Sequence, residues 1–88
     1  MSVEFDPAKN KINIRKHGID LAETEAAFFD PHAITIEDRD NDEQRFVTIG
    51  SDVFGRILVI CYTWRDNEVI RVISAREAEP HERKHYEG

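Results

Sequence analysis

The stretch that decides the fold runs from residue 56 to residue 75 and reads RILVICYTWRDNEVIRVISA. Residues 56–64 are nearly all apolar and rich in branched and aromatic side chains, which is typical of a buried central strand. Residues 65–68 are polar and predict a turn, after which residues 69–75 return as a second long strand. A connection this short cannot carry a parallel crossover, so the two strands are predicted to be antiparallel.

Two further strands are predicted before this pair. Ile34 and Ile36 alternate with other residues over 33–37, as in a half-buried strand, and residues 46–49 form the next strand, which ends at Gly50. The acidic segment 37–43 between them suits a solvated hairpin loop. The result is an antiparallel four-stranded meander, to which residues 3–5 allow a short extra N-terminal strand.

Two helices are predicted ahead of the meander. Asp6 and Pro7 predict the start of the first, over residues 7–17, with Gly18 as its left-handed stop. Its apolar side is thin and consists of Ala8, Ile12 and Ile14. The second helix, over residues 21–29, has a wider apolar stripe made of Leu21, Ala22, Ala26, Phe28 and Phe29.

A short C-terminal helix over residues 80–87 completes the predicted fold. It begins at Pro80 and is too short to be stable unless it docks on the sheet. The predicted class is therefore α+β, with residues 1–88 forming one domain, since 88 residues suffice for only one modest core.

The overall charge is −6, although RNA-binding proteins are usually basic. The charge is unevenly distributed along the chain: residues 9–16 carry four cations and no acid, whereas residues 37–43 carry five acids and one arginine. Because steering depends on the local field, a basic first helix can still attract a polyanion.

The compartment is predicted to be the cytoplasm. The single cysteine, Cys61, permits no intramolecular disulfide and lies in an apolar run, which fits a reducing environment. The N-terminus has no basic, apolar leader, and the longest apolar run, residues 57–62, is far too short for a membrane span.

Lys16 and His17 are the first candidate site residues. They end the basic first helix, where cations also simply favour the negative end of the helix dipole. The functional alternative places both side chains near a phosphate, because lysine neutralises developing charge and histidine exchanges protons near neutral pH. Lys9 and Arg15 add to the positive charge of the same helix.

Arg71 and Arg76 are candidates on the last strand. Arg71 interrupts an apolar run, so it is either solvated, paired with an acid, or aimed into a groove where it grips phosphate. For Arg76 a structural role is favoured. The two are five residues apart, so a regular strand puts them on opposite faces unless a bulge intervenes.

Three other side chains have both a structural and a functional interpretation. Arg83 and Tyr86 share a face of the last helix, where Tyr86 either anchors the helix or contacts RNA. Arg45 follows the acidic loop, and pairing with Asp42 or Glu43 is its simplest role.

Residues 81–85, HERKH, match the H-E-x-x-H zinc-protease pattern. A zinc protease needs a long, rigid helix, a third ligand and supporting hydrogen bonds. Because the predicted helix is short, charged and terminal, the match is interpreted as accidental and no metal is expected.

The chain resembles the BrnT toxin family, also called DUF497, over nearly its whole length. The matching segments, in order, are FDPAK (5–9), KHG (16–18), FFDP (28–31), RFVTIG (45–50), YT (62–63), IRVISAR (70–76), and Glu82-Arg83 followed by Tyr86. The resemblance implies a RelE-like fold with N-terminal helices packed on an antiparallel sheet.

The resemblance also implies a function: the toxin of a type II toxin–antitoxin system, a metal-independent endoribonuclease that arrests growth. The partner it implies is a BrnA-type antitoxin with a ribbon-helix-helix domain, through which the complex binds operator DNA. The family's site residues carry over to Lys16, His17, Arg45, Arg71, Arg76, Arg83 and Tyr86. The C-terminal helix departs from the family pattern, because Glu77, Glu79, Glu82 and Glu87 dilute its positive charge.

The predicted mechanism is attack by the RNA's own 2′-hydroxyl, without cofactor. The catalytic residues are predicted to be Lys16, His17, Arg71, Arg76 and Tyr86, with Lys9, Arg15, Arg45 and Arg83 binding RNA. The alternative is a non-catalytic protein-binding module of the same fold, which the negative net charge favours.

Overall fold

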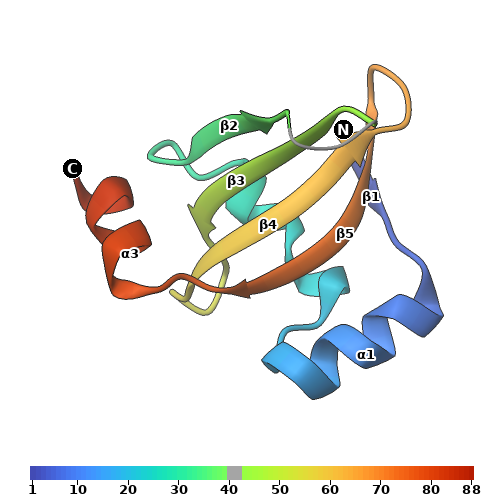
Figure 1. Ribbon diagram of the computed structural model, residues 1–88, viewed down its shortest axis with the longest axis horizontal. Coiled ribbons are helices and arrows are strands. Elements are labelled where there is room, and N and C mark those ends of the chain that lie inside the picture. The colour runs from blue at the N-terminus through green and yellow to red at the C-terminus, as the bar shows by residue number, and fades with distance from the viewer. Residues whose placement is uncertain (40–42) are drawn as a thin grey trace.

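A computed structural model of the chain describes residues 1–39 and 43–88. Its elements, in chain order, are β1 (Ser2–Glu4), α1 (Pro7–His17), the 3₁₀ turn η1 (Leu21–Glu23), α2 (Glu25–Phe28), β2 (Ile34–Asp38), β3 (Arg45–Ser51), β4 (Ile57–Trp64), β5 (Val69–Glu77) and α3 (Pro80–Glu87). The described strands form one twisted sheet in the order β1-β5-β4-β3-β2 (Figure 1).

The predicted meander is confirmed for β2 to β5, which pair as antiparallel neighbours. The sheet has five strands rather than four, because the extra N-terminal strand that the sequence allowed is present as β1, and the expectation of a purely antiparallel sheet is wrong, because β1 pairs parallel to β5. Val3 pairs with Ile70, and the Ser2 amide donates to the Glu68 carbonyl at 2.8 Å. This parallel pairing is possible because most of the chain separates the two strands, so no tight turn constrains their direction.

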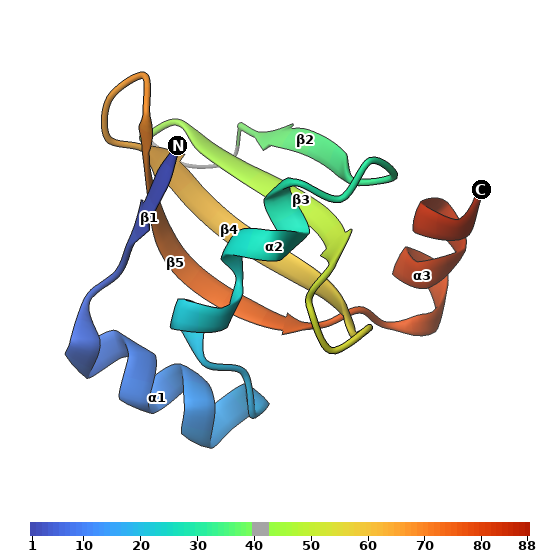
Figure 2. The same cartoon turned by 180° about the vertical axis from the view of Figure 1, so that it is seen from behind.

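The segment from α1 to α2 lies against one face of the sheet, whereas α3 stands at the end of the sheet, as Figure 2 shows. Ile19, Leu21 and Ala27 from this layer are buried against the sheet. The sheet residues that face them are Leu58, Ile60, Tyr62, Ile70, Val72 and Ala75. The core therefore lies between the sheet and the segment from η1 to α2.

The second predicted helix is divided at Thr24 into η1 and α2. The buried Thr24 hydroxyl donates to the Leu21 carbonyl at 2.8 Å, which closes the 3₁₀ turn locally instead of continuing a regular helix. The break changes the helical phase, so Ala27 is buried whereas Phe29 is 64% exposed. The predicted apolar stripe is consequently wrong at Ala22 and Phe29.

The predicted apolar side of α1 is also wrong. Ile12 is 62% exposed and Ile14 is 42% exposed, whereas Asn13 between them is 5% exposed. The helix therefore docks through a polar side chain rather than through an apolar stripe.

A β-bulge interrupts the pairing of β4 with β5. Cys61 pairs with Ser74, but the next residue, Tyr62, pairs with Val72, so Ile73 is the extra residue. The bulge reverses the alternation of side chains along β5. Arg71 and Arg76 consequently lie on the same face of the sheet, opposite the face that η1 and α2 cover.

Candidate active site

A hollow of about 190 Å³ lies between α1 and β5. Its lining residues are Lys9, Ile12, Asn13, Lys16 and His17 from the helix, with Ile73 and Ser74 from the strand. The helical residues recur every three or four positions and so form one face of α1. The hollow is smaller than the pockets of about 300–1,000 Å³ that hold drug-sized ligands, so it suits a phosphate group rather than a whole nucleotide.

Asn13 fixes α1 against β5. Its Nδ2 donates to the carbonyls of Ala75 and Ile19, both at 2.8 Å, and its Oδ1 accepts from the Ala75 amide at 3.2 Å. Strand β1 pairs with β5 only as far as Arg71, so the Asn13 amide replaces the missing strand at the open edge. Lys16 and His17 follow on the same helical face and are thereby placed beside Ser74.

The hollow is electropositive through its side chains alone. Lys9 and Lys16 are exposed, His17 is half-buried, and no carboxylate belongs to the described residues that line it. The C-terminal end of α1 carries a partial negative charge, which disfavours an anion. The lysines must therefore supply the attraction for a phosphate.

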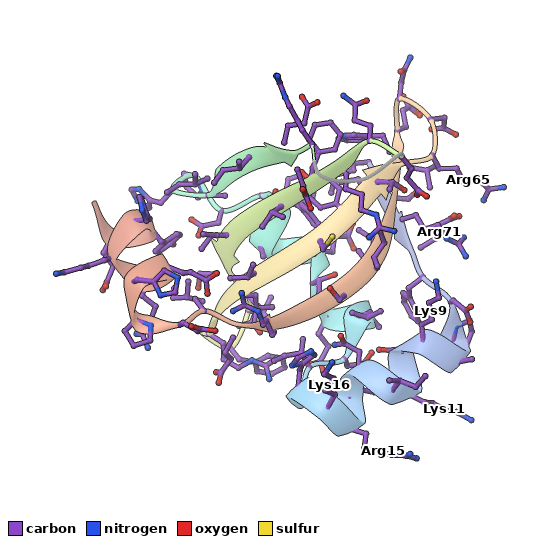
Figure 3. All side chains as sticks on the ribbon, in the orientation of Figure 1. Lys9, Lys11, Arg15, Lys16, Arg65 and Arg71 are labelled. Atoms are coloured by element: carbon purple, nitrogen blue, oxygen red, sulfur yellow. The ribbon has the colours of Figure 1, made fainter. Side chains whose placement is uncertain are left out.

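Arg71 lies on β5, two residues before the hollow begins, and Arg65 lies in the adjoining turn. The two guanidinium groups share one carboxylate: Glu4 accepts from Arg65 at 2.8 Å and from Arg71 at 3.0 Å. Hydrogen bonding to Arg65, with a smaller contribution from Arg71, lowers the pKa of Glu4. Arg65 and Arg71 lie on the same side of the molecule as Lys9 (Figure 3).

Arg76 lies at the other end of β5 and is held by α3. Its guanidinium donates to both oxygens of Glu82, at 2.7 and 2.8 Å. This bidentate contact lowers the pKa of Glu82 to about 2 and raises the pKa of Arg76. The structure therefore does not bring Arg76 into the hollow.

Tyr86 anchors α3 to the turn that follows α2. Its hydroxyl donates to Asp30, whose carboxylate also accepts from the amides of His32 at 3.0 Å and Ser51 at 2.8 Å. The tyrosine hydrogen bond lowers the pKa of Asp30, and the same contact raises the pKa of Tyr86. Arg83 is exposed on α3, which lies across the molecule from α1 in both ribbon views (Figures 1 and 2).

Arg15 and Arg45 lie outside the hollow. Figure 3 shows Arg15 extending away from the sheet. Arg45 begins β3 opposite Asp38, and its Nε is buried without a hydrogen-bond partner in the described part of the chain. Of its two predicted partners, Asp42 lies outside the described residues.

No metal centre forms from the H-E-x-x-H segment in the part of the chain that the structure describes. Across residues 1–39 and 43–88, no three His, Cys, Asp or Glu side chains gather closely enough to hold a metal ion. Glu82, the glutamate of the segment, is instead tied to Arg76. Burial raises the pKa of the Cys61 thiol, against a smaller opposing effect of Arg45, so Cys61 is not an activated nucleophile.

The sequence from residue 5 to residue 82 matches the model of a family described as the ribonuclease toxin, BrnT, of type II toxin-antitoxin system. The chain belongs to the BrnT family. Family membership implies RNA as substrate class and an antitoxin as partner. No curated protein sequence matches the chain.

A solved structure supports this assignment. The crystal structure of the Brucella abortus ribonuclease toxin BrnT, at 1.1 Å resolution, superposes with a TM-score of 0.74 at 28% sequence identity. The match covers 90% of this chain and 97% of that one. Among the described helices of this BrnT-family chain, none has the length and apolar character needed to cross a bilayer.

Sequence reasoning missed two polar residues that line the hollow, Asn13 and Ser74. Asn13 lies between two isoleucines, which an amphipathic pattern assigns to the buried side. The available signal was its spacing: Lys9, Asn13, Lys16 and His17 occupy one helical face. Ser74 shares a face with Arg71 only through the bulge, which the strand pattern does not predict.

Proposed function

We propose that this BrnT-family chain is a metal-independent endoribonuclease that arrests growth when its antitoxin is absent. The proposal rests on one observation: Lys9, Lys16 and His17 line a single hollow together with Ser74. Arg71, which shares the Glu4 carboxylate with Arg65, lies on the same strand as Ser74. The neutralising partner is a BrnA-type antitoxin, whose ribbon-helix-helix domain binds the operator DNA. The toxin acts in the cytoplasm.

The reaction proceeds through the 2′-hydroxyl of the RNA. A base removes its proton, the 2′-oxygen attacks the neighbouring phosphorus, and the bond from phosphorus to the 5′-oxygen breaks as an acid protonates that oxygen. The products are a 2′,3′-cyclic phosphate and a 5′-hydroxyl. No metal is required, because the chain's own side chains move the protons and stabilise the charge.

His17 carries protons in this scheme, since it is half-buried at the hollow and an imidazole can both accept and donate a proton. Lys16 contacts the phosphate from the same helical turn, and Ser74 offers a hydroxyl on the opposite wall. Arg71 exchanges part of its contact with Glu4 for a phosphate oxygen when RNA binds.

The remaining predicted residues contribute differently. Lys9 and Arg15 bind the RNA backbone from α1. Arg45 and Arg83, which lie outside the hollow, contact the RNA backbone farther from the scissile phosphate. Arg76 and Tyr86 are each held by a carboxylate, which favours a role in positioning α3 over direct chemistry. The −6 net charge is compatible with RNA binding because α1 carries four cations and no acid.

Expression of the chain without its antitoxin tests the proposal. We expect growth arrest and loss of intact RNA in cells that express the parent chain. His17→Ala and Arg71→Ala are expected to relieve the arrest, because each removes a group from the site while leaving the buried core unchanged. Growth and RNA integrity are followed together, with expression levels matched by immunoblotting.

Lys11→Ala is the matched control. Lys11 lies on the same helix as His17, and its replacement removes one positive charge, as Arg71→Ala does. Lys11 does not line the hollow and extends away from the sheet in Figure 3. This variant should remain toxic. If His17→Ala and Arg71→Ala are as toxic as the parent, the site is wrong. If the parent neither arrests growth nor degrades RNA, the rival function of a non-catalytic protein-binding module replaces the nuclease.

A further inference from the structure

The hollow between α1 and β5 has an apolar part that the proposed reaction does not use. Ile12 and Ile73 line it together with the two lysines, His17 and Ser74. Ile12 is 62% exposed and therefore lies at the mouth of the hollow, whereas Ile73 is half-buried. The hollow thus offers apolar surface as well as positive charge to whatever binds there.

Ile12 lies between the two lysines of the hollow. It follows Lys9 by three residues and precedes Lys16 by four, so the three side chains form one row on α1. Among the ion pairs formed within residues 1–39 and 43–88, none involves either lysine or His17. The lysines are therefore available to an anion that also contacts Ile12.

The bulge in β5 brings the second isoleucine to the hollow. Cys61 pairs with Ser74 and Tyr62 pairs with Val72, so Ile73 has no partner on β4. Ile73 and Ser74 consequently line the hollow as neighbours. A regular strand would not allow this, because consecutive side chains point to opposite faces, and bulges are common beside active sites because they re-aim a side chain.

The combination of cationic and apolar side chains matches one nucleotide unit of RNA. Such a unit carries an anionic phosphate and, a short distance away, a base with an apolar face. The hollow of about 190 Å³ accepts the phosphate, which leaves the base at the mouth, against Ile12. An inorganic phosphate would leave the isoleucines uncovered, and an apolar peptide would leave the lysines without a partner.

We propose that Ile12 and Ile73 form a base-binding surface, on which the nucleobase next to the bound phosphate packs. The inference rests on the proposed function for RNA as the ligand. Neither isoleucine side chain donates or accepts a hydrogen bond, so the contact favours a base over no base and does not select among the four bases.

The test compares two oligomers that carry the same number of phosphates. One is an octamer of 2′-O-methyluridine, which attack by a 2′-hydroxyl cannot cleave, and the other is the same octamer without its bases. Isothermal titration calorimetry at low salt measures the affinity of the chain for each, because phosphate contacts weaken as salt rises. We expect the parent to bind the uridine octamer about tenfold more tightly than the base-free octamer.

Ile12→Ala removes the apolar surface at the mouth. It should weaken binding of the uridine octamer about fivefold and change binding of the base-free octamer by less than about twofold. Alanine is the better helix former, so α1 is retained, which circular dichroism checks. Ile12→Leu restores a side chain of equal size and should bind both octamers as the parent does.

Ile14→Ala is the matched control, because Ile14 is 42% exposed on the same helix but does not line the hollow. It should bind both octamers as the parent does, whereas Lys16→Ala should weaken both equally through the loss of a phosphate contact. The inference is overturned if Ile12→Ala affects the two octamers equally or not at all, or if Ile14→Ala shows the same loss. It is also overturned if the parent binds neither octamer or binds the two alike.

Cleavage of unmodified RNA by the parent separates the two proposals. Base-dependent binding through Ile12 without any cleavage would contradict the nuclease and retain the base-binding surface. Cleavage by the parent, with octamer binding that Ile12→Ala leaves unchanged, would retain the nuclease and contradict the base-binding surface.

Discussion

Asn13 shows how one polar side chain decides the position of a helix. Its amide makes three hydrogen bonds of 2.8 to 3.2 Å, two of them to the backbone of Ala75. Replacing it leaves a buried carbonyl and amide of β5 without partners, and such a loss costs about 1–3 kcal/mol per site.

We therefore expect Asn13→Ala to lower the free energy of unfolding by about 2 kcal/mol. Urea unfolding followed by circular dichroism measures this change. Asn67→Ala, in the exposed turn before β5, serves as the control and should stay within about 0.5 kcal/mol of the parent. A midpoint for Asn13→Ala equal to that of the parent would show that α1 is held by something else.

The Arg76–Glu82 pair predicts a pH dependence of stability. The pKa of Glu82 falls from 4.5 to about 2 on folding, so its contribution is fully present above pH 4.5 and is lost as the pH falls toward 2. Because the Arg76 side chain is 36% exposed, solvent screening reduces the contribution to about 1 kcal/mol.

Glu82→Gln tests this pair. The variant should be less stable than the parent by about 1 kcal/mol at pH 7, and the difference should shrink between pH 4.5 and pH 2. Parallel denaturation series across this range provide the measurement. A difference that stays constant with pH would assign the effect to packing rather than to charge.

At the scale of elements, α3 is attached by a few polar contacts. Two of them come from separate parts of the chain: Tyr86 with Asp30, and Arg76 with Glu82. None of the residues of α3 is fully buried. The helix therefore depends on these contacts more than on apolar burial.

Tyr86→Phe retains the ring and removes the hydroxyl. We expect faster hydrogen exchange in residues 80–87, because the contact with Asp30 is lost, while exchange in β4 stays slow. Cleavage activity is expected to fall less than in His17→Ala. If activity is abolished while exchange in α3 is unchanged, Tyr86 acts directly in the chemistry.

The sequence predicts some elements better than others. The run from 57 to 64 specifies β4, since its burial on the helical face follows strict alternation. The pairing of β1 and the docking of α1 were harder to predict. Both use the same edge of β5, with β1 pairing as far as Arg71 and Asn13 of α1 bonding the backbone of Ala75, and the sequence does not show how this edge is divided. The bulge at Ile73 has no local signature in the sequence, so whether Arg71 and Arg76 share a face could be stated only as a condition.

At the scale of the whole molecule, α1 and α3 lie on opposite sides (Figure 1). The hollow lies beside α1, which carries four cations and no acid, so the net charge of −6 does not describe the surface next to it. The basic helix singled out Lys16 and His17, which the structure places in the hollow, whereas the separation of Arg76, Arg83 and Tyr86 from them required the tertiary structure.

The most direct test of the account is the rate at which the purified chain cuts an RNA oligonucleotide in the presence of EDTA. The account predicts cleavage that leaves 2′,3′-cyclic phosphate ends, a rate about 100-fold lower for His17→Ala, and a rate within about twofold of the parent for Lys11→Ala. Cleavage that EDTA abolishes, or equal rates for the parent and both variants, would contradict it.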